Sequence, residues 1–226
     1  MTTQQRWASP VHQSQDATLI LVRHGESLWN AQGRVQGHSE SSLNELGREQ
    51  ARRVAQHLAK QKVHAVYASD VSRAVETAQL IAAPHQLKIH TSPQLRERSY
   101  GVLEGKTLEE AGRTQGSWFI SWLADRRSAP PAGESQDDMC ARIIAAVREV
   151  ARAHPRQTVV IVSHGGPIKG ALHEILRIPP TLWRLTWIDN GSITVLRGTP
   201  DVMRVACFND TCHLTGVALH ADEAED

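Results

Sequence analysis

The stretch TLILVRHGES, residues 18–27, decides how this chain folds. Its first half is an apolar run suited to a strand buried on both faces, and the run stops abruptly at an Arg-His-Gly triplet. A second stretch, TVVIVSHGG at residues 158–166, repeats the pattern and also ends in a histidine followed by glycine. Two strands that each deliver a histidine, His24 and His164, predict a single site assembled from both.

Amphipathic helices and further short strands alternate along the rest of the chain. Residues 45–60 place apolar side chains at i, i+3, i+4 and i+7, which makes one helical face. Either Ser69 or Asp70 is expected to cap the start of the next helix, at 71–82. Further helices are expected from Thr107, after the turn APPAGES at 129–135, and near 167–176. Further strands are expected at 63–68, 87–90, 193–197 and 202–207. The aromatic residues of 118–123 are expected to form a lid or a packed flank.

This alternation predicts the fold class. Short strands that are apolar on both faces, separated by amphipathic helices, are typical of an α/β fold with a mostly parallel sheet. We therefore expect a three-layer αβα sandwich that forms a single domain over residues 18–226, preceded by a disordered tail at residues 1–17. Ligands of such sheets bind beyond the carboxyl ends of the strands, which is where both histidines lie.

The composition excludes several classes of function. The chain has 226 residues with 25 basic and 24 acidic side chains and no basic stripe, so a nucleic-acid partner is not expected. No apolar run reaches the ~18 residues of a membrane span, and no secretory signal precedes the first strand, so we expect a cytoplasmic protein without a membrane partner. The cysteines lack metal-type spacing and are expected to be buried, reduced thiols: Cys140, Cys207 and Cys212.

The residues at the strand ends suit phosphate chemistry. A guanidinium such as that of Arg23 presents a planar fork that matches two phosphoryl oxygens. Gly25 lets the backbone approach closely and leaves an N–H for an oxygen. A neutral imidazole, such as that of His24 near neutral pH, can attack phosphorus directly. Six other histidines are scattered along the chain and are expected on the solvated surface, not in a metal site: His12, His38, His57, His85, His90 and His154.

The motif LVRHGES resembles the signature of the histidine phosphatase superfamily, in its phosphoglycerate-mutase-like branch. Five further blocks follow in that family's order and extend the resemblance over residues 18–198. These blocks are WNAQGRVQGHSESSLNELGREQA, YASDVSRAVETAQ, LRERSYGVLEGKTLEE, PPAGES and VVIVSHGGPIK. The resemblance implies the phosphoglycerate-mutase-like version of the αβα sandwich.

The resemblance also implies a role for each matching residue. His24 is the nucleophile that becomes phosphohistidine, and Glu97 is the general acid toward the leaving oxygen and then the base toward water. One branch of the superfamily takes its acid from an aspartate directly after the second histidine; Gly165 stands there in this chain, which leaves Glu97, with Glu104 and Glu134 as the next candidates. Residues implied in holding the phosphoryl group or the substrate are Arg23, Arg73, His164, Asn30, Gln36, Gly37, Arg98, Tyr100 and Gly165. No metal or cofactor is implied, because side-chain cations supply the positive charge.

Three functions are open at this point. The main hypothesis is a phosphomonoesterase that passes phosphate from a small metabolite to the histidine and then to water. The first alternative is a cofactor-dependent phosphoglycerate mutase, which Arg98 and Tyr100 of the ERSYG block favour. Against it, the chain lacks the insertion with which the mutases shield the phosphoenzyme from water. The third is a catalytically inactive phospholigand-binding protein, which the filled catalytic positions disfavour.

The substrate and several individual residues are also open. Phosphoserine, phosphoglycerates and sugar phosphates all fit as the small-molecule phosphate ester, and the protein is expected to be a monomer or a homodimer. Lys106 and Lys169 either border the pocket or are surface cations. The block FNDTCHL at 208–214 resembles a tail of some phosphatase members, and packing at a strand end is the expected role of Asn209 and His213.

Overall fold

The computed structural model describes residues 15–217. Residues 1–14 of the tail predicted at residues 1–17 therefore lie outside the described residues. The strands and helices alternate as the sequence predicts. The strands are β1 (Ala17–Arg23), β2 (Ala65–Ala68), β3 (Ile89–Thr91), β4 (Thr158–Ser163), β5 (Ile193–Gly198) and β6 (Met203–Asp210). The helices are α1 (Leu28–Ala31), α2 (Glu45–Leu58), α3 (Ser72–Ala82), α4 (Leu108–Thr114), α5 (Ser117–Ala124), α6 (Gln136–Ala153) and α7 (Gly165–Leu176).

The six strands form one sheet in the order β3-β2-β4-β1-β5-β6. The first four of these run parallel to one another, whereas β5 runs antiparallel to β1 and β6 antiparallel to β5. In the register, Arg23 at the end of β1 lies opposite Ser163 at the end of β4. The sheet is therefore mostly parallel, as predicted, and its two histidine-bearing strands end side by side.

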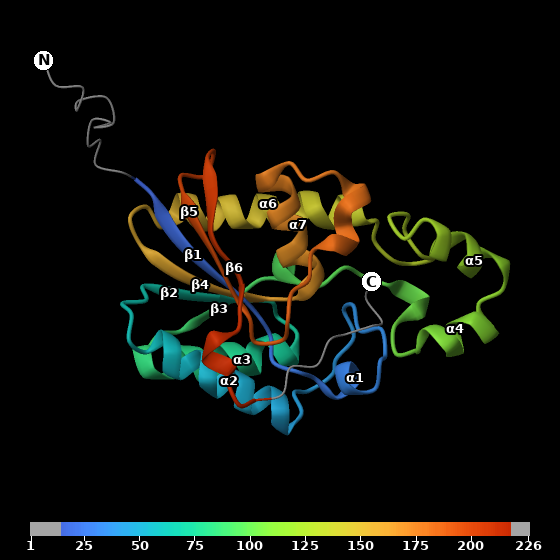
Figure 1. The fold of residues 1–226 in the computed structure, drawn as a ribbon, viewed down its shortest axis with the longest axis horizontal. Coiled ribbons are helices and arrows are strands. Elements are labelled where there is room, and N and C mark those ends of the chain that lie inside the picture. Colours follow the sequence, from blue (N-terminus) through green and yellow to red (C-terminus); the bar gives the residue numbers. More distant parts are fainter. Residues whose placement is uncertain (1–14, 218–226) are drawn as a thin grey trace, which may run out of the picture.

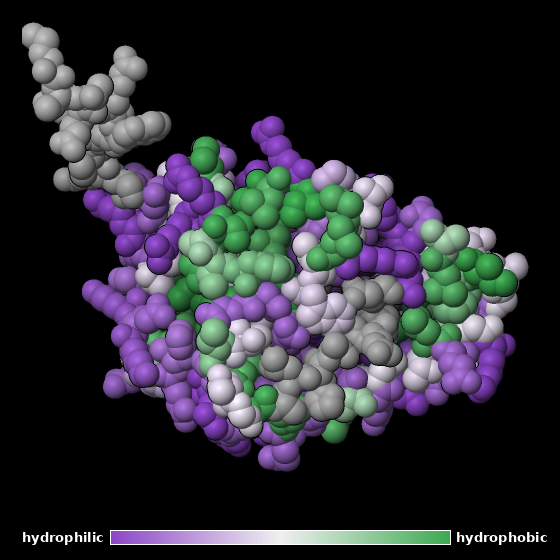
Figure 2. Space-filling model, in the orientation of Figure 1, coloured by the Kyte–Doolittle hydropathy of each residue, from purple (hydrophilic) through white to green (hydrophobic). Residues whose placement is uncertain are grey.

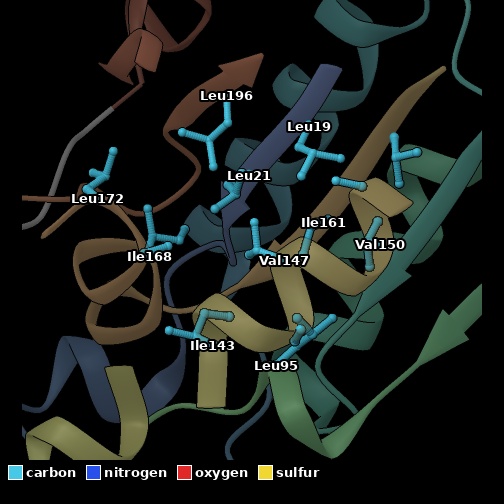
Figure 3. Close-up of a cluster of buried hydrophobic side chains, with 14 of the residues drawn as sticks. Leu19, Leu21, Leu95, Ile143, Val147, Val150, Ile161, Ile168, Leu172 and Leu196 are labelled. Carbon is cyan, nitrogen blue, oxygen red and sulfur yellow. The ribbon is translucent and has the colours of Figure 1, made fainter. Parts of the chain in front are cut away.

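Helices cover both faces of this sheet, with α6 and α7 on one face and α2 and α3 on the other (Figure 1). Successive side chains of a strand point to opposite faces. Leu19 and Leu21 of β1 accordingly join the core under α6 and α7, part of which Figure 3 shows. Ile20 and Val22 join a second core, under α2 and α3. The predicted three-layer αβα sandwich is confirmed.

Helices α4 and α5 form a flank that projects beyond the end of the sheet (Figure 1). The flank has a small apolar core of its own, in which Phe119 and Trp122 of α5 pack with Tyr100 and Leu103. The aromatic segment predicted as a lid or a packed flank is therefore packed, and it stands beside the carboxyl edge of the strands. Thr107 caps α4, as the sequence predicts, by accepting a hydrogen bond from the Glu110 backbone N–H.

The start of α3 differs from the prediction. The N-cap is Val71, which makes no side-chain capping bond, and neither Ser69 nor Asp70 serves as the cap. Asp70 instead forms a bidentate ion pair with Arg96, with N···O distances of 2.6 and 2.7 Å. A local pattern favours the cap, but a guanidinium from a distant segment offers the carboxylate two charged hydrogen bonds, which are stronger.

Two properties of the surface complete the description. Of the three free cysteines, Cys140 is buried, Cys207 is half-buried and Cys212 is exposed, so the prediction that all three are buried is wrong. Apolar surface gathers over β6 and the segment after α7 (Figure 2), where the exposed apolar side chains include those of Leu185, Val202 and Phe208. Within residues 15–217, no helix combines the length and the apolar character that crossing a membrane requires.

Candidate active site

The two histidines that follow β1 and β4 meet at the carboxyl edge of the sheet. Because Arg23 and Ser163 are paired in the register, the next residue of each strand emerges at the same place. The ring centroids of His24 and His164 lie 4.9 Å apart with the planes at 65°. Their side chains are 2% and 1% exposed, respectively. The site assembled from both strand ends is thus present.

The hydrogen bonds of His24 define which ring nitrogen is reactive. Its Nδ1 lies 2.7 Å from the carbonyl oxygen of Gly25, and since a carbonyl only accepts, Nδ1 carries the proton. Nε2 is then the unprotonated nitrogen, and it accepts a hydrogen bond from Nε of Arg73 at 3.3 Å. Burial holds the pKa of His24 well below 6.5, and the charges of Arg73 and Arg23 lower it further. A neutral imidazole with a free lone pair on Nε2 is the form that can attack phosphorus.

Two guanidinium groups flank this nitrogen in fixed positions. Arg73 of α3 is fully buried, and its Nη1 and Nη2 donate to the carbonyl oxygens of Ser39 and Gly37 at 2.9 and 2.7 Å. Arg23 donates from Nη1 to the carbonyl of Ile188 at 2.6 Å. A guanidinium held by backbone carbonyls keeps one orientation, so these two cations are preorganised for oxygen atoms that carry negative charge.

His164 is a buried polar group whose ring nitrogens have no hydrogen-bond partner among the described residues. Its pKa lies well below 6.5, chiefly because of burial and then because of the charges of Arg73, His24 and Arg23. An unsatisfied buried imidazole costs stability, which indicates that its partner is a ligand. His164 also occupies the N-cap position of α7, where the helix dipole favours an anion.

Glu97 is held at four points. Its Oε1 accepts from the backbone N–H of Arg98 at 2.7 Å, and its Oε2 accepts from that of Gly166 at 3.0 Å. Its own carbonyl oxygen accepts from Nη2 of Arg142 at 3.2 Å and from Nε2 of His38 at 2.9 Å. Burial raises the pKa of the Glu97 carboxyl, while the two backbone donors and the nearby arginines partly offset that rise. A carboxyl of this kind can carry a proton nearer neutral pH than an exposed glutamic acid.

Three of the residues that position Glu97 are absent from the predicted set. His38, expected on the solvated surface, is half-buried and bonded to the Glu97 backbone, so that prediction is wrong. Arg142 of α6 shows no sequence signal beyond its charge, because it binds the Glu97 segment through backbone carbonyls in addition to its pair with Glu134. Gly166 does have a sequence signal, because it is the second of the two glycines that follow His164. A Cβ at Gly166 would overlap the Glu97 carboxylate.

Gly25 plays a different part from the predicted one. Its N–H donates to Oγ1 of Thr77 at 3.2 Å, so the prediction that this N–H serves a ligand oxygen is wrong. A Cβ at Gly25 would overlap the backbone of Gly47, at the start of α2. The position requires glycine because two backbone segments approach closely here, and close backbone approach is what the sequence predicts for Gly25.

Asn30 and Gln36 meet in the loop that begins after β1. Oδ1 of Asn30 accepts from the backbone N–H of Ser27 at 3.0 Å, which completes a capping box at the start of α1. Oγ of Ser27 donates to Oε1 of Gln36 at 2.7 Å. These contacts hold the loop whose carbonyl at Gly37 binds Arg73. Direct contact of Asn30, Gln36 or Gly37 with a substrate stays a prediction.

Arg98 and Tyr100 stand under the flank. The guanidinium of Arg98 lies over the Tyr100 ring, 5.4 Å from its centroid. Its nitrogens donate to the carbonyl oxygens of Glu134, Arg126 and Ser128 at 2.5 to 2.8 Å. Arg98 therefore ties the segment after α5 to the site, and both residues line the cavity described below.

The two other carboxylates considered as acids are engaged elsewhere. Glu134 forms a bidentate pair with Arg142 at 2.8 Å for both contacts. Glu104 accepts hydrogen bonds from the hydroxyl of Ser39 and the backbone N–H groups of His38 and Tyr100. Both carboxylates brace loops, which leaves Glu97 as the carboxyl at the site.

The loop before β5 forms hydrogen bonds with the residues at the end of β1. The side-chain amide of Asn190 donates to the carbonyl of His24 at 3.0 Å, and the N–H of Gly191 donates to the same oxygen at 3.2 Å. Ile188 supplies the carbonyl that binds Arg23. The position of His24 thus depends on a segment more than 160 residues away in the chain.

The FNDTCHL block braces that loop in turn. The amide of Asn209 accepts from the N–H of Asp189 at 2.8 Å and donates to its Oδ2 at 2.7 Å, with Asn209 in the left-handed region at φ +47°. Nε2 of His213 donates to the carbonyl of Gly191 at 2.9 Å. The expected strand-end packing is therefore present, and it supports the loop that holds His24.

A cavity of about 460 Å³ adjoins this cluster. Its lining includes Arg23, Glu97, Gly165 and Gly166, together with residues of α5, α6, α7, the segment after α5 and the 3₁₀ segment Pro180–Leu185. The two histidine rings are buried beside these residues and do not line the cavity. Among residues 15–217, no cluster of three or more His, Cys, Asp or Glu side chains could hold a metal ion.

Comparison with known proteins agrees with this geometry. The family model of the histidine phosphatase superfamily (branch 1) matches residues 19–211. The chain is 37% identical over 203 residues to phosphoglycerate mutase-like protein 4 of Arabidopsis thaliana, covering 88% of this chain and 87% of that protein. It is 32% identical over 222 residues to the metal-independent phosphoserine phosphatase of the same plant, covering 95% and 90%, respectively. The solved structure of Bacillus stearothermophilus YhfR matches with a TM-score of 0.82 at 33% identity, over 88% of this chain and 99% of that one. The chain therefore belongs to the histidine phosphatase superfamily, branch 1.

Proposed function

We propose that this histidine phosphatase hydrolyses small phosphate monoesters through a phosphohistidine formed at Nε2 of His24. One observation carries the proposal: Nε2 is unprotonated and lies beside the Arg73 guanidinium and the unpartnered ring of His164. The enzyme acts in the cytoplasm as a single domain over residues 18–226, as a monomer or a homodimer. Three free thiols agree with that compartment.

The first half-reaction transfers the phosphoryl group to the protein. The lone pair of His24 Nε2 forms a bond to phosphorus while the bond from phosphorus to the ester oxygen breaks. Glu97 in its protonated form donates its proton to that oxygen, so the product leaves as an alcohol. Arg23, Arg73 and His164 offset the charge on the three equatorial oxygens.

The second half-reaction returns the enzyme to its starting state. The Glu97 carboxylate accepts a proton from water as the water oxygen bonds to phosphorus and the nitrogen–phosphorus bond breaks. Inorganic phosphate leaves, His24 regains its lone pair, and Glu97 is protonated for the next cycle. The same buried carboxyl serves both steps, and its raised pKa suits a group that must give and take a proton.

A phosphatase is favoured over a mutase by the short flank. The chain between the ERSYG block and the PPAGES turn holds two short helices, α4 and α5, of 7 and 8 residues. A flank of this size leaves the phosphoenzyme accessible to water. Substrates of the phosphoserine, phosphoglycerate or sugar phosphate type fit the cavity, and one relative is itself named as a phosphoserine phosphatase.

Labelling tests the covalent step. Brief incubation with ³²P-labelled substrate followed by rapid quenching should give a phosphoprotein that is labile to acid and stable to base. His24→Ala should not label, and its activity should fall by several orders of magnitude because the covalent route is gone. His57→Ala is the matched control, since His57 is exposed on α2, and it should label normally. Full labelling of His24→Ala would place the nucleophile elsewhere.

Product analysis separates the phosphatase from the mutase. The purified protein should release inorganic phosphate from several monoesters without added 2,3-bisphosphoglycerate, and EDTA should leave the rate unchanged because side chains supply the positive charge. Conversion of 3-phosphoglycerate to 2-phosphoglycerate faster than hydrolysis of any monoester would establish the mutase instead.

A further inference from the structure

A single peptide group holds the ring of His24. The carbonyl oxygen that accepts from its Nδ1 at 2.7 Å belongs to the peptide between Gly25 and Glu26. The N–H of the same peptide donates to Oε1 of Gln50, a residue of α2, at 2.8 Å. A peptide is planar and trans, so its oxygen and its N–H point in opposite directions and cannot turn independently. Gln50 is thus linked to the His24 ring through one rigid group.

The glycine at this point makes such an anchor necessary. A side chain is excluded at Gly25 because a Cβ there would overlap the carbonyl group of Gly47. Without a Cβ, however, the torsions of Gly25 have few steric limits, and the peptide that follows can rotate about them. A hydrogen bond to its N–H opposes that rotation, because turning the peptide would break the bond. The residue that accepts this bond therefore controls where the carbonyl oxygen points.

Gln50 is a polar side chain on the buried face of α2. Its exposed fraction is 0%, and its neighbours on that face, Ala51 and Val54, are buried to the same degree. A buried amide costs stability unless it forms hydrogen bonds, so a glutamine is favoured at such a position only where its polar atoms have partners. The N–H of Glu26, whose residue is itself buried, is one such partner.

The stem of Gln50 also lies beside the loop that binds the backbone of His24. A Cβ at Gly191 would be 3.2 Å from Cβ of Gln50, so the two residues are close neighbours in space. The N–H of Gly191 donates to the carbonyl oxygens of Arg23 and His24, at 3.0 and 3.2 Å. Gln50 therefore stands between the two backbone segments that hold the histidine.

We infer that Gln50 is a positioning residue for phosphoryl transfer, which keeps the proton of His24 on Nδ1 and the lone pair of Nε2 available. The inference rests on the proposed function of His24 as the nucleophile. The hydrogen bond at one ring nitrogen sets the form and orientation of the imidazole. The bond from Arg73 to Nε2 favours the same form, but the Arg73 N–H groups must also serve the phosphoryl oxygens. The bond at Nδ1 can persist throughout the transfer, because phosphorus bonds only to Nε2.

The bond at Nδ1 also affects how strongly Nε2 attacks. Burial lowers the pKa of His24, as do the charges of Arg73 and Arg23, whereas the hydrogen bond to the Gly25 carbonyl raises it. Loss of this bond would make Nε2 less basic and therefore a weaker nucleophile.

Gln50→Met tests the inference in the kinetics, because methionine is of similar length and has only a weakly accepting sulfur. The rate of His24 phosphorylation, measured in the burst or single-turnover phase, should fall about 10- to 100-fold. An alkyl phosphate and nitrophenyl phosphate should be slowed by the same factor, because the nucleophile is impaired and the acid is not. The affinity for inorganic phosphate should stay as in the wild type, since the groups proposed to hold it are intact.

The imidazole gives a second readout, which does not depend on activity. In protein labelled with ¹⁵N-histidine, the Nδ1–H proton of His24 should resonate downfield, as a hydrogen bond to a carbonyl requires, and His24→Ala identifies the signal. In Gln50→Met this proton should move upfield or be lost through exchange with water. Val54→Ala is the matched control, because it removes buried atoms from the same face of α2 one turn later. It should leave the signal and the phosphorylation rate unchanged.

Three results would contradict the inference. Gln50→Met with the wild-type rate overturns it. So does a slower Gln50→Met whose Nδ1–H signal is unchanged, because Gln50 would then act only through the packing of α2. A wild-type protein that forms no phosphohistidine overturns the proposed function and the inference with it, and the labelling experiment detects that outcome separately. If Gln50→Met does not fold, Gln50→Asn takes its place, since its shorter side chain cannot bring the oxygen to the Glu26 N–H.

Discussion

At the scale of single residues, Glu97 is the most constrained part of the site. Two backbone N–H groups hold its carboxylate, and two side chains from other segments hold its carbonyl. These hydrogen bonds hold the carboxyl group in one orientation. The proton that we propose it donates is therefore directed to one position in the site. The role assigned to it can be tested through the substrate, because only some leaving groups need that proton.

Glu97→Gln should discriminate between esters. An alkyl phosphate expels an alkoxide of high pKa, so loss of the acid should slow phosphorylation of His24 by about 10²- to 10⁴-fold. Nitrophenolate hardly needs the proton, so nitrophenyl phosphate should be affected far less. The comparison is made on the burst or single-turnover phase, because the same residue also activates water in the second step. Arg73→Lys is the control, and it should slow both esters. Equal slowing of the two by Glu97→Gln would make Glu97 a binding residue.

The residues of the site differ in how far the sequence predicts them. Arg23, His24 and His164 follow directly from two apolar runs, because parallel strands deliver their last residues to one edge. Glu97 and Arg73 carry no such periodicity and emerge only through the resemblance to a family. His38 and Arg142 escape both routes, since they bind a carbonyl oxygen, which every residue has and which no sequence pattern marks.

At the scale of secondary structure elements, the first turn of α7 does two tasks. His164 precedes the helix at its cap, and the N–H of Gly166 in the first turn binds the acid. The helix thus fixes the distance between His164, which we propose to hold phosphate, and Glu97, which we propose to protonate the leaving oxygen. That arrangement requires a glycine where the carboxylate approaches the backbone.

Gly166→Ala should separate stability from activity. Helical propensity favours alanine over glycine by up to about 1 kcal/mol and offsets part of the cost of displacing the buried carboxylate, so the free energy of unfolding should fall by no more than about 2 kcal/mol. The new Cβ would overlap the Glu97 carboxylate and displace it, so hydrolysis of alkyl phosphates should fall by at least tenfold, while nitrophenyl phosphate is less affected.

A second glycine provides the control for this change. Gly112 of α4 is also helical, and a Cβ there would lie 3.6 Å from the Phe119 ring, an ordinary contact. Gly112→Ala should therefore leave the rates unchanged. Gly166→Ala with wild-type rates on alkyl phosphates would show that the carboxylate does not depend on this N–H.

The elements themselves were largely predictable, and the exceptions are instructive. The strongly periodic helix α2 and the apolar strands β1 and β4 appear where the pattern places them. The weak strand predicted at 87–90 appears two residues later, as Ile89–Thr91, because its register is set by pairing with β2. The residues of a strand alone do not determine where it pairs with its neighbour, so its exact bounds could not be predicted from them.

At the scale of the whole molecule, the buried histidines link stability to pH. The pKa values of His24 and His164 lie well below 6.5 in the folded protein and near 6.5 in the unfolded chain. Below pH 6.5 the unfolded chain therefore binds more protons, and the free energy of unfolding falls as the pH falls. For each histidine this loss should steepen from about 0.7 kcal/mol per pH unit at pH 6.5 toward about 1.4 kcal/mol per pH unit at lower pH.

Urea denaturation at pH 6.5 and 5.5 measures this dependence. His164→Gln removes one of the two titrating groups, so its free energy of unfolding should fall by about 1 kcal/mol less than that of the wild type between the two pH values. Taking the difference between the two proteins cancels the contributions of all other groups. Equal losses in both would mean that His164 is protonated in the folded state.

The central position of β1 bears on how the protein is made. This strand is synthesised before the other five described strands of the sheet, yet its two neighbours, β4 and β5, begin at residues 158 and 193. Until they are synthesised, β1 has neither edge paired, and contacts of such long sequence separation form slowly. The loop that grips His24 is translated just before β5, and the block that braces the loop comes later still. His24 is thus translated long before the segments that position it, so a polypeptide released before β6 is complete lacks the proposed catalytic site.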